Sequence, residues 1–350
     1  MSSINVTILG CGRWASGHAW YQSTVLKNNV LMWGRAGDAI YDELAMTRKN
    51  DFWELPTNVE LTSDLDGAIN NADFILVVIA AQGMRELGDR IAKSLKADKT
   101  KSKKTFILCM KGIDDTTHET LVQVLRRLLD ENGVGDRATI CVWVGPGHTA
   151  ELVTGQPGVM IVDGECREAT RDIATRFRSD SMKLYMGNDL VGAEVGAAAK
   201  NVLGIAAGIL DGSDMQGLKG ALMARGAYEV SKLIVAMGGK QITAYGLSHL
   251  GDFEATLFSR NSNNRRFGQA LIEFIKDKKE IPADVVSQLR LPLAEGVGTA
   301  KAMYMLAKKH NVEMPITNSV YRLLHKGSNP MEEFREIFLR GNLCEFGECQ

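Results

Sequence analysis

The sequence has no excess of charge of either sign. Its 41 basic and 42 acidic residues give a formal net charge of −1 at pH 7. Nucleic acids and anionic membrane surfaces attract proteins that carry a positive excess, so this balance argues against both as partners. The composition, 45% hydrophobic and 24% charged, is typical of a soluble globular protein. We therefore expect no nucleic-acid partner and no membrane partner.

Long apolar runs free of charge are also missing. The most apolar stretch, residues 191–212, contains Glu194, Lys200 and Asp211, so it does not predict a membrane-spanning helix. The first residues, Met1-Ser-Ser-Ile-Asn-Val, enter a predicted strand almost at once and lack the pattern of a secretory signal. A cytoplasmic location is the expectation.

Cysteine pairs with the close spacing of a metal site are absent as well. The six cysteines are Cys11, Cys109, Cys141, Cys166, Cys344 and Cys349. We interpret them as reduced thiols of a cytosolic protein, and the last two as part of a frayed tail. Nothing in the sequence predicts a metal site.

Short apolar runs alternate with helical stretches through the first half of the chain. The runs are rich in Val and Ile with little polar alternation, as in strands that are buried on both faces. They span residues 4–9, 30–33, 74–79, 105–110, 139–144 and 159–162. This alternation predicts an α/β domain over residues 1–188, built on a doubly wound parallel sheet.

The strand signals stop after about Leu184. From Asp189 to Arg340 the pattern predicts helices, broken by loops at 210–217, 238–239 and 261–264. Residues 189–350 are therefore predicted to form an all-α domain. Because no flexible linker separates the two parts, we expect them to pack directly on each other, with a cleft between them.

The first glycine-rich motif follows a predicted strand and opens a predicted helix. Its residues Gly10-Cys11-Gly12-Arg13-Trp14-Ala15 fit the pattern G-x-G-x-x-G/A. Gly10 permits a tight turn, and Gly12 lets backbone amides approach a pyrophosphate at the helix N-terminus. The motif predicts a Rossmann domain that binds NAD(P) at this turn, where Arg13 and Trp14 also lie. An ordinary strand–helix turn is the alternative.

Cofactor choice is usually decided at the end of the second strand. Enzymes specific for NAD place Asp or Glu there to bind the ribose hydroxyls. Here the first charged residue is Arg35, and Asp38 comes late in the loop. Arg35 favours NADPH, or the use of both cofactors, because a guanidinium binds a 2′-phosphate or stacks on adenine. A solvated turn residue is the alternative.

Two further motifs follow predicted strands and so fall at the carboxyl edge of the sheet, where open α/β folds bind ligands. Lys111 ends one strand, in CMKG, and Gly145-Pro146-Gly147-His148 ends the next. Lys111 and His148 are therefore candidate site residues. A lysine that ends a strand is often a surface residue, and a turn histidine is more often incidental.

Lys200 lies in the middle of the apolar stretch at 191–212. The residues on its own helical face are almost all glycine or alanine, among them Gly196, Gly204 and Gly208. Each glycine inside a helix costs about 1 kcal/mol relative to alanine, so something is expected to approach the backbone closely there. Either the small residues make room for nicotinamide and substrate, or they allow tight helix packing while Lys200 extends to the surface.

A fourth segment joins an acidic residue to a cationic loop. Asp252 ends an apolar run, Thr256 follows four residues later, and Arg and Asn residues fill positions 260–266. Arginines with asparagines suit an oxyanion such as phosphate. A solvated charged loop is the alternative.

Together these stretches resemble the NAD(P)-dependent glycerol-3-phosphate dehydrogenase family, particularly its bacterial members. The resemblance covers nearly the whole chain. Its most specific parts are the segments EVGAAAKNVLGIAAGILDG and GDFEAT followed by NNRRFG; others are GCGRWA, RKNDFWELP, CMKG, VGPGHTAE, ALMARG, EGVGTAKAMYMLA and VEMPIT.

The resemblance implies reversible reduction of dihydroxyacetone phosphate to sn-glycerol 3-phosphate, for phospholipid synthesis, by an enzyme that is often a dimer. It implies that Lys200 is the general acid–base residue, beside Lys111 and Asp252. A lysine suits this role because burial disfavours its charged form, whereas a guanidinium keeps its proton. The remaining implied residues are Asn201, Thr256, Asn264 and Arg265 for the substrate, and Gln82 and Glu295 for the cofactor.

Two departures from the family pattern leave alternatives open. Asn263 stands where the phosphate-binding arginine is expected, and Arg265 or Arg260 is a candidate to replace it. Gly147-His148-Thr149-Ala150 stands where many bacterial members have Ser-Phe-Ala-Lys. The alternatives are a related β-hydroxyacid or sugar-phosphate dehydrogenase, and a nucleotide-binding regulator that has lost catalysis.

Overall fold

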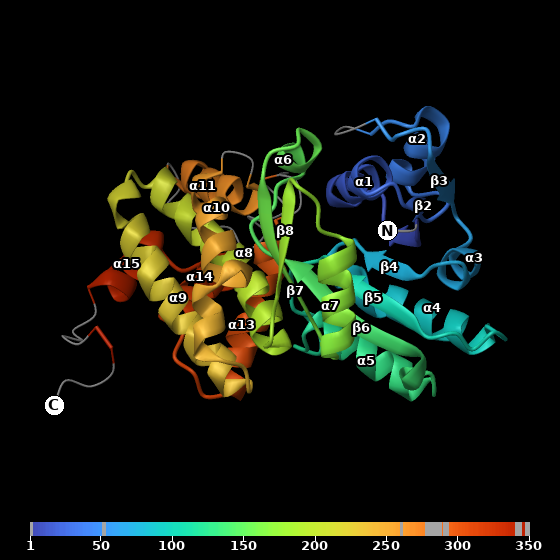
Figure 1. Ribbon diagram of the computed structural model, residues 1–350. Coiled ribbons are helices and arrows are strands. Elements are labelled where there is room, and N and C mark those ends of the chain that lie inside the picture. The colour runs from blue at the N-terminus through green and yellow to red at the C-terminus, as the bar shows by residue number, and fades with distance from the viewer. Residues whose placement is uncertain are drawn as a thin grey trace.

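The structure has a sheet half and a helical half, which pack directly on each other (Figure 1). It is a computed structural model that describes residues 3–50, 54–259, 262–276, 289, 294–339 and 345–346. Arg260, Asn261 and the terminal pair Cys344 and Cys349 lie outside the described residues. The other four cysteines are free thiols.

The first half contains one eight-stranded sheet in the order β3-β2-β1-β4-β5-β6-β7-β8. The strands are β1 (Asn5–Leu9), β2 (Asn29–Trp33), β3 (Val59–Thr62), β4 (Phe74–Val77), β5 (Lys104–Leu108), β6 (Ala138–Val144), β7 (Gly158–Gly164) and β8 (Met182–Met186). All neighbouring strands are parallel except β6 and β7. The six predicted strands are present, and the strand order reverses direction between β1 and β4.

Two strands were missing from the sequence prediction. β3 and β8 form the two edges of the sheet, where one face of each strand is partly exposed. Their sequences, VELT and MKLYM, therefore mix polar and apolar residues and lack the continuous apolar run of the central strands. The antiparallel pairing of β7 with β6 was not predicted either.

Helices cover both faces of the sheet. On one face the core joins the sheet to α3 (Leu65–Asn70), α4 (Met84–Ala97) and α5 (Leu121–Glu131). On the other face it joins the sheet to helices that include α1 (Arg13–Trp20), α2 (Ala39–Thr47), α6 (Thr149–Val153) and α7 (Arg167–Arg176). This is the doubly wound arrangement that the alternation of strands and helices predicted.

The helical half is built around α8 (Leu190–Gly212), whose neighbours include most of the later helices that the structure describes. These are α9 (Lys219–Ala236), α10 (Asp252–Phe258), α11 (Asn263–Ile275), α13 (Glu295–Lys309) and α14 (Pro315–Lys326), and α15 (Pro330–Phe338) packs on α14. By length and hydropathy α8 passes a test for a membrane span, but 94% of the tested window is buried inside the protein. It is therefore a core helix.

Neighbouring helices occupy the space next to the glycines on the face of α8 that carries Lys200. A Cβ on Gly196 would lie 2.7 Å from the Cβ of His249, and a Cβ on Gly204 would lie 2.9 Å from Cγ2 of Thr256. A Cβ on Gly208 would overlap the backbone oxygen of Arg265. The expectation that these glycines make room for nicotinamide and substrate was wrong, because helix packing occupies the space.

The expected loop at 261–264 also differs from the structure. α11 begins at Asn263, and the hydroxyl of Ser262 caps it by accepting the amide of Arg265. Serine at this position is among the strongest helix-starting signals. Asn263 and Asn264 therefore lie in the first turn of a helix.

Candidate active site

The turn after β1 has the geometry of a pyrophosphate cradle. Gly10 has φ +135°, and a Cβ there would overlap the backbone oxygen of Val78 at the end of β4. Gly12 is the N-cap of α1 with no side-chain cap, and a Cβ there would meet nothing within 4 Å. The first turn of α1 has no acidic residue. Uncapped amides facing open space without a competing carboxylate fit a bound pyrophosphate.

Trp14 and the turn after β6 meet beside this cradle. The Trp14 ring packs edge-on against His18, with centroids 4.5 Å apart, and lies close to Gly147. Thr149 directs its methyl group at the backbone of Gly17. The departure from Ser-Phe-Ala-Lys is thus accommodated, in part, by packing between α6 and α1. Arg13 is exposed at the start of α1.

Arg35 lies just beyond β2 and pairs with a carboxylate. Its guanidinium is 2.7 Å from Glu86 on α4, and both side chains are more than half exposed. Asp38 instead caps α2 by accepting the amide of Ile40, so it serves the helix. The charged pair at the expected ribose position is therefore Arg35 with Glu86.

Lys111, Lys200 and Asp252 lie together at the junction of the two halves. The Lys111 Nζ is 2.6 Å from Oδ2 of Asp252, and the Lys200 Nζ is 3.3 Å from Oδ1 of the same carboxylate. The three side chains are 15%, 14% and 5% exposed, respectively. Both lysines remain partly accessible while the carboxylate is buried. The structure therefore brings the three predicted catalytic residues into one cluster.

Further contacts fix the direction of each lysine. Lys111 donates to the backbone oxygen of Gly145 over 3.0 Å, which ties it to the end of β6. Lys200 donates to the hydroxyl of Thr256 over 3.0 Å, and that hydroxyl donates to the backbone oxygen of Asp252. One turn of α10 thus supplies both the carboxylate and the hydroxyl that hold Lys200, as the spacing of four residues allows.

A chain of amides extends the cluster to α13. Asn201 donates to the backbone oxygen of Lys111 and to Oε2 of Glu295, over 3.2 and 3.3 Å. Asn264 donates to Oδ1 of Asn201 over 3.0 Å and accepts the amide of Gly296 over 2.9 Å. Gln82, after β4, lies against the same helix, with Nε2 3.1 Å from where a Cβ on Gly298 would be.

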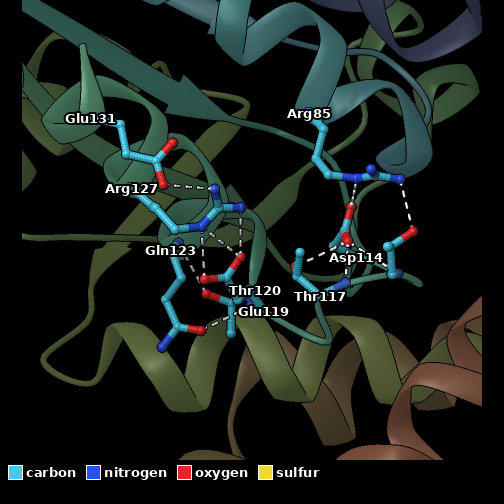
Figure 2. A network of polar contacts seen from close by, with 9 residues as sticks. Arg85, Asp114, Thr117, Glu119, Thr120, Gln123, Arg127 and Glu131 are labelled. Carbon is cyan, nitrogen blue, oxygen red and sulfur yellow. Dashed lines mark hydrogen bonds and ion pairs between the residues drawn. The ribbon is translucent and has the colours of Figure 1, made fainter.

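The loop that follows Lys111 is held by a polar network (Figure 2). Arg85 of α4 donates to the fully buried carboxylate of Asp114, which also accepts the amide and the hydroxyl of Thr117. Thr120 and Gln123 form a reciprocal capping box at the start of α5. Such a network fixes the backbone next to Lys111 and so limits the motion of its side chain.

Glu194 joins this loop to α8. Its buried carboxylate accepts the Thr120 hydroxyl over 2.7 Å and the Val122 amide over 2.9 Å. In the sequence alone, Glu194 is recognisable only as a charge in an apolar run. Because α8 also carries Lys200, this contact connects the segments that supply the two lysines.

Burial and neighbouring charges perturb several groups of the cluster. Burial lowers the pKa of Lys111; the carboxylate of Asp252 opposes this shift, and the nearby Lys200 cation adds to it. Burial raises the pKa of Glu295, against the effect of the two lysines. Burial also lowers the pKa of His148, on which both lysines act as well. His148 therefore lies within electrostatic range of the cluster.

The Arg265 side chain contacts α8 and the end of α10. Its Nε donates to Asp211 of α8 over 2.5 Å, and one terminal nitrogen donates to the backbone oxygens of Phe258 and Ser259. The other candidate replacement for the expected arginine, Arg260, lies outside the described residues. Asp211 also pairs with Lys219 of α9. Sequence reasoning missed Asp211 and Lys219, because the pairs that Asp211 forms with Lys219 and Arg265 depend on how three helices cross.

Comparison with known proteins agrees with this arrangement. Residues 5–170 match the model of the NAD-dependent glycerol-3-phosphate dehydrogenase N-terminus, and residues 189–335 match that of its C-terminus. The chain belongs to this family. A glycerol-3-phosphate dehydrogenase of Staphylococcus aureus strain JH9 is 33% identical over 348 residues, covering 97% of this chain and 99% of the relative. One from Salinibacter ruber is 32% identical over 344 residues, covering 97% and 95%.

Solved structures of the family have the same fold. The crystal structure of glycerol-3-phosphate dehydrogenase from Coxiella burnetii superposes with a TM-score of 0.84 at 27% identity, covering 97% of this chain and 99% of that chain. A glycerol-3-phosphate dehydrogenase from Plasmodium falciparum gives 0.81 at 19% identity, covering 98% and 97%, which bears on the fold alone. The predicted family, fold class and NAD(P) dependence are confirmed. The roles of single residues and the domain boundary stay predictions.

Proposed function

We propose that this NAD(P)-dependent member of the family reduces dihydroxyacetone phosphate to sn-glycerol 3-phosphate with Lys200 as the general acid. The observation that carries the assignment is the pair of lysines on one buried carboxylate, at the carboxyl edge of the sheet. The Gly12 turn follows β1 and Lys111 follows β5, so both lie at the carboxyl edge of the sheet, and a dinucleotide held at that turn would extend toward the lysines.

A nicotinamide cofactor, when bound at the Gly12 turn, would supply the hydride for the carbonyl carbon. The carbonyl oxygen then needs a proton, and Lys200 gives it from Nζ in the forward reaction and takes it back in reverse. Lys111 stabilises the negative charge that grows on the oxygen, because its ammonium is already fixed by Asp252 and Gly145. Thr256 directs Lys200 through the hydrogen bond between them.

The remaining assignments form part of the same proposal. Gly10, Gly12, Arg13, Trp14 and Arg35 bind the cofactor. Gln82 and Glu295 border its nicotinamide end, which is supported by the contact of Glu295, the first residue of α13, with Asn201 and by the position of Gln82 against Gly298 of the same helix. Substrate contacts are Asn201, Thr256 and Asn264, whereas Arg265, predicted as a phosphate ligand, is held by Asp211. Residues 1–188 form the cofactor domain and residues 189–350 the substrate domain.

Three broader expectations follow from family membership. We infer a homodimer, a cytoplasmic enzyme, and a product that is consumed in glycerophospholipid synthesis. Cofactor preference rests on Arg35, which favours NADPH or the use of both cofactors. A sizing column with light scattering tests the homodimer directly.

The deciding experiment follows nicotinamide absorbance with dihydroxyacetone phosphate, using NADH and NADPH in parallel. Wild type should turn over, and Lys200→Ala should lower kcat by roughly 100-fold or more, because a positioned general acid contributes that much. Lys200→Arg should not restore turnover, since guanidinium keeps its proton. Lys93→Ala is the matched control, because Lys93 pairs on the surface of α4.

One observation keeps a second candidate function in view. Asn263 stands where the family has a phosphate-binding arginine, so a related hydroxyacid or sugar phosphate is the alternative substrate. A wild-type enzyme that binds NADPH but leaves dihydroxyacetone phosphate unreduced would reject the first proposal. A panel of phosphorylated and unphosphorylated carbonyls would then identify the substrate.

A further inference from the structure

Asp211, Lys219 and Arg265 form a buried charge cluster beyond the catalytic residues, named here the Asp211 cluster. Asp211 lies in the last turn of α8 and contacts Lys219 Nζ through Oδ1 at 2.6 Å and Arg265 Nε through Oδ2 at 2.5 Å. The side chains are 8%, 9% and 21% exposed, respectively. One carboxylate therefore holds cations from the first residue of α9 and the first turn of α11.

The two cations also bind the carboxyl end of α10. Lys219 donates to the backbone oxygen of Leu257 over 3.4 Å. Arg265 donates to the backbone oxygens of Phe258 and Ser259 over 3.3 and 3.2 Å. The last carbonyls of a helix lack partners within it and carry partial negative charge, so cations stabilise this end. The Asp211 cluster thus fixes where α10 ends.

α10 is the helix that holds Lys200 in place. Asp252 and Thr256 lie within its seven residues, and Thr256 is only one residue before Leu257. Asp211 and Lys200 both belong to α8, eleven residues apart, or about 16 Å along a helix. α10 is therefore attached to α8 at two places, the catalytic contacts at one and the Asp211 cluster at the other.

We propose that the Asp211 cluster is a positioning device for proton transfer, and that Arg265 acts through it and does not bind the substrate phosphate. The inference rests on the proposed function, because it concerns the geometry of Lys200. Loss of Asp211 leaves the buried Lys219 and the partly buried Arg265 without their shared carboxylate, and loss of Arg265 frees the end of α10. Either change moves Thr256 and Asp252 relative to Lys200.

The test uses Asp211→Asn, Arg265→Met and the double variant, all in the full-length enzyme. Each single variant should lower kcat roughly 10-fold to 100-fold, because a small misplacement of a catalytic group has an effect of that size. The dissociation constant for NADPH, from quenching of tryptophan fluorescence, should stay within about twofold. The double variant should lose no more than the worse single, since the two residues act as a unit.

A matched control separates positioning from loss of fold. Arg322 of α14 likewise holds buried Glu333 and the Ser319 hydroxyl, away from α10. Arg322→Met should lower the melting temperature about as much as Arg265→Met while kcat stays within twofold of wild type. Arg265→Lys, which retains a charge for Asp211, should recover part of the lost kcat.

The KM for dihydroxyacetone phosphate decides between the two roles of Arg265. A phosphate ligand contributes to binding in the ground state, so its loss raises KM and can leave kcat unchanged. A rise in KM alone in Arg265→Met, or wild-type kcat in Asp211→Asn, would overturn the proposal.

A second measurement needs no turnover, so it holds even if the proposed substrate is wrong. Acetic anhydride labels lysines, and mass spectrometry of peptides gives the rate at Lys200. Labelling of Lys200 should rise at least threefold in Asp211→Asn, because its contacts with Thr256 and Asp252 are lost, while labelling of surface Lys93 stays constant. Equal rates at Lys200 in the variant and wild type would also reject the positioning role. An inactive wild type with altered labelling would reject only the proposed substrate.

Discussion

The carboxylate of Asp252, on the helical half, lies 2.6 Å from the ammonium of Lys111, on the sheet half. The contact crosses the junction between the two matched family segments, residues 5–170 and 189–335. Because Lys200 binds the other oxygen of the same carboxylate, the proposed catalytic cluster exists only where both halves are folded and packed together.

Asp252→Asn should therefore affect the acid–base behaviour of Lys111. The carboxylate opposes the lowering of the pKa of Lys111, so its removal should lower that pKa further. We expect kcat/KM to fall by roughly 100-fold or more, and the alkaline limb of its pH profile to move to lower pH. The measurement is kcat/KM between pH 6 and 10. An alkaline limb at the wild-type position would contradict the electrostatic role of Asp252.

Gly208→Ala should destabilise the protein, because the added Cβ overlaps the backbone oxygen of Arg265. Overpacking of a core costs about 1–3 kcal/mol, and a backbone neighbour relaxes less than a side chain. Gly220→Ala, in α9, is the matched control, because a Cβ there meets nothing within 4 Å. That change should be neutral or stabilise by up to about 1 kcal/mol. Urea unfolding of both variants checks the prediction, which fails if the two shift stability in the same direction.

Stability should fall as the pH rises from about 4.5 toward 7, through the buried carboxyl of Glu194. Burial raises the pKa of Glu194 from 4.5 to about 7. The folded state then binds the proton more tightly than the unfolded chain. Below pH 4.5 the carboxyl is protonated in both states and costs no folding free energy. Above about pH 7 it is ionised in both states, and burying the charge lowers the free energy of unfolding by an amount on the order of 3 kcal/mol.

Glu194→Gln tests this linkage. The variant should differ little from wild type at pH 5, because the buried carboxyl is protonated there and, like the amide, offers one strongly accepting oxygen to the donors from Thr120 and Val122. Its loss of stability between pH 5 and pH 8 should nevertheless be smaller than that of wild type, since the titrating group is gone. Guanidinium unfolding at both pH values measures the difference. Burial also raises the pKa of Glu229 to about 7, and this residue contributes the same dependence of stability on pH in the variant and in wild type.

Cofactor choice should respond to the pair of Arg35 and Glu86. The carboxylate of Glu86 occupies the guanidinium and would repel a 2′-phosphate. Glu86→Gln should increase the ratio of kcat/KM for NADPH over NADH several-fold, and Arg35→Ser should decrease it. Steady-state kinetics with both cofactors measures the ratio, preferably at low salt, where exposed charges act most strongly. Equal ratios in wild type and Arg35→Ser would remove Arg35 from cofactor recognition.

The sequence predicted the parts of the fold that follow from local pattern. Buried central strands and the Gly10 turn have continuous apolar runs or fixed glycine spacing, so they could be recognised directly. The edge strands β3 and β8 could not, because partial exposure interrupts their apolar pattern. The sequence predicts a loop at the first turn of α11, because the polar residues there outweigh the cap signal of Ser262.

The candidate site was predictable where single residue types indicate chemistry. Lys111, Lys200, Asp252 and Thr256 are close to one another in the structure, as the family resemblance implied. The pair of Arg265 and Asp211 shows the limit. The role of Arg265 as a phosphate ligand stays a prediction, but nothing in the sequence indicates its partner Asp211, 54 residues earlier in the chain. The crossing of α8 and α11 brings the two residues together, and the spacing of residues in the sequence does not predict that crossing.

The contact between Gly17 and Thr149 bears on how such a chain changes over generations. The methyl group of Thr149 occupies the space that a side chain at position 17 would need. A lineage that carries threonine at 149 is therefore restricted to glycine at 17 unless α6 shifts, and glycine has to arise first for threonine to be tolerated. We therefore expect positions 17 and 149, which are 132 residues apart, to change together among descendants of this chain.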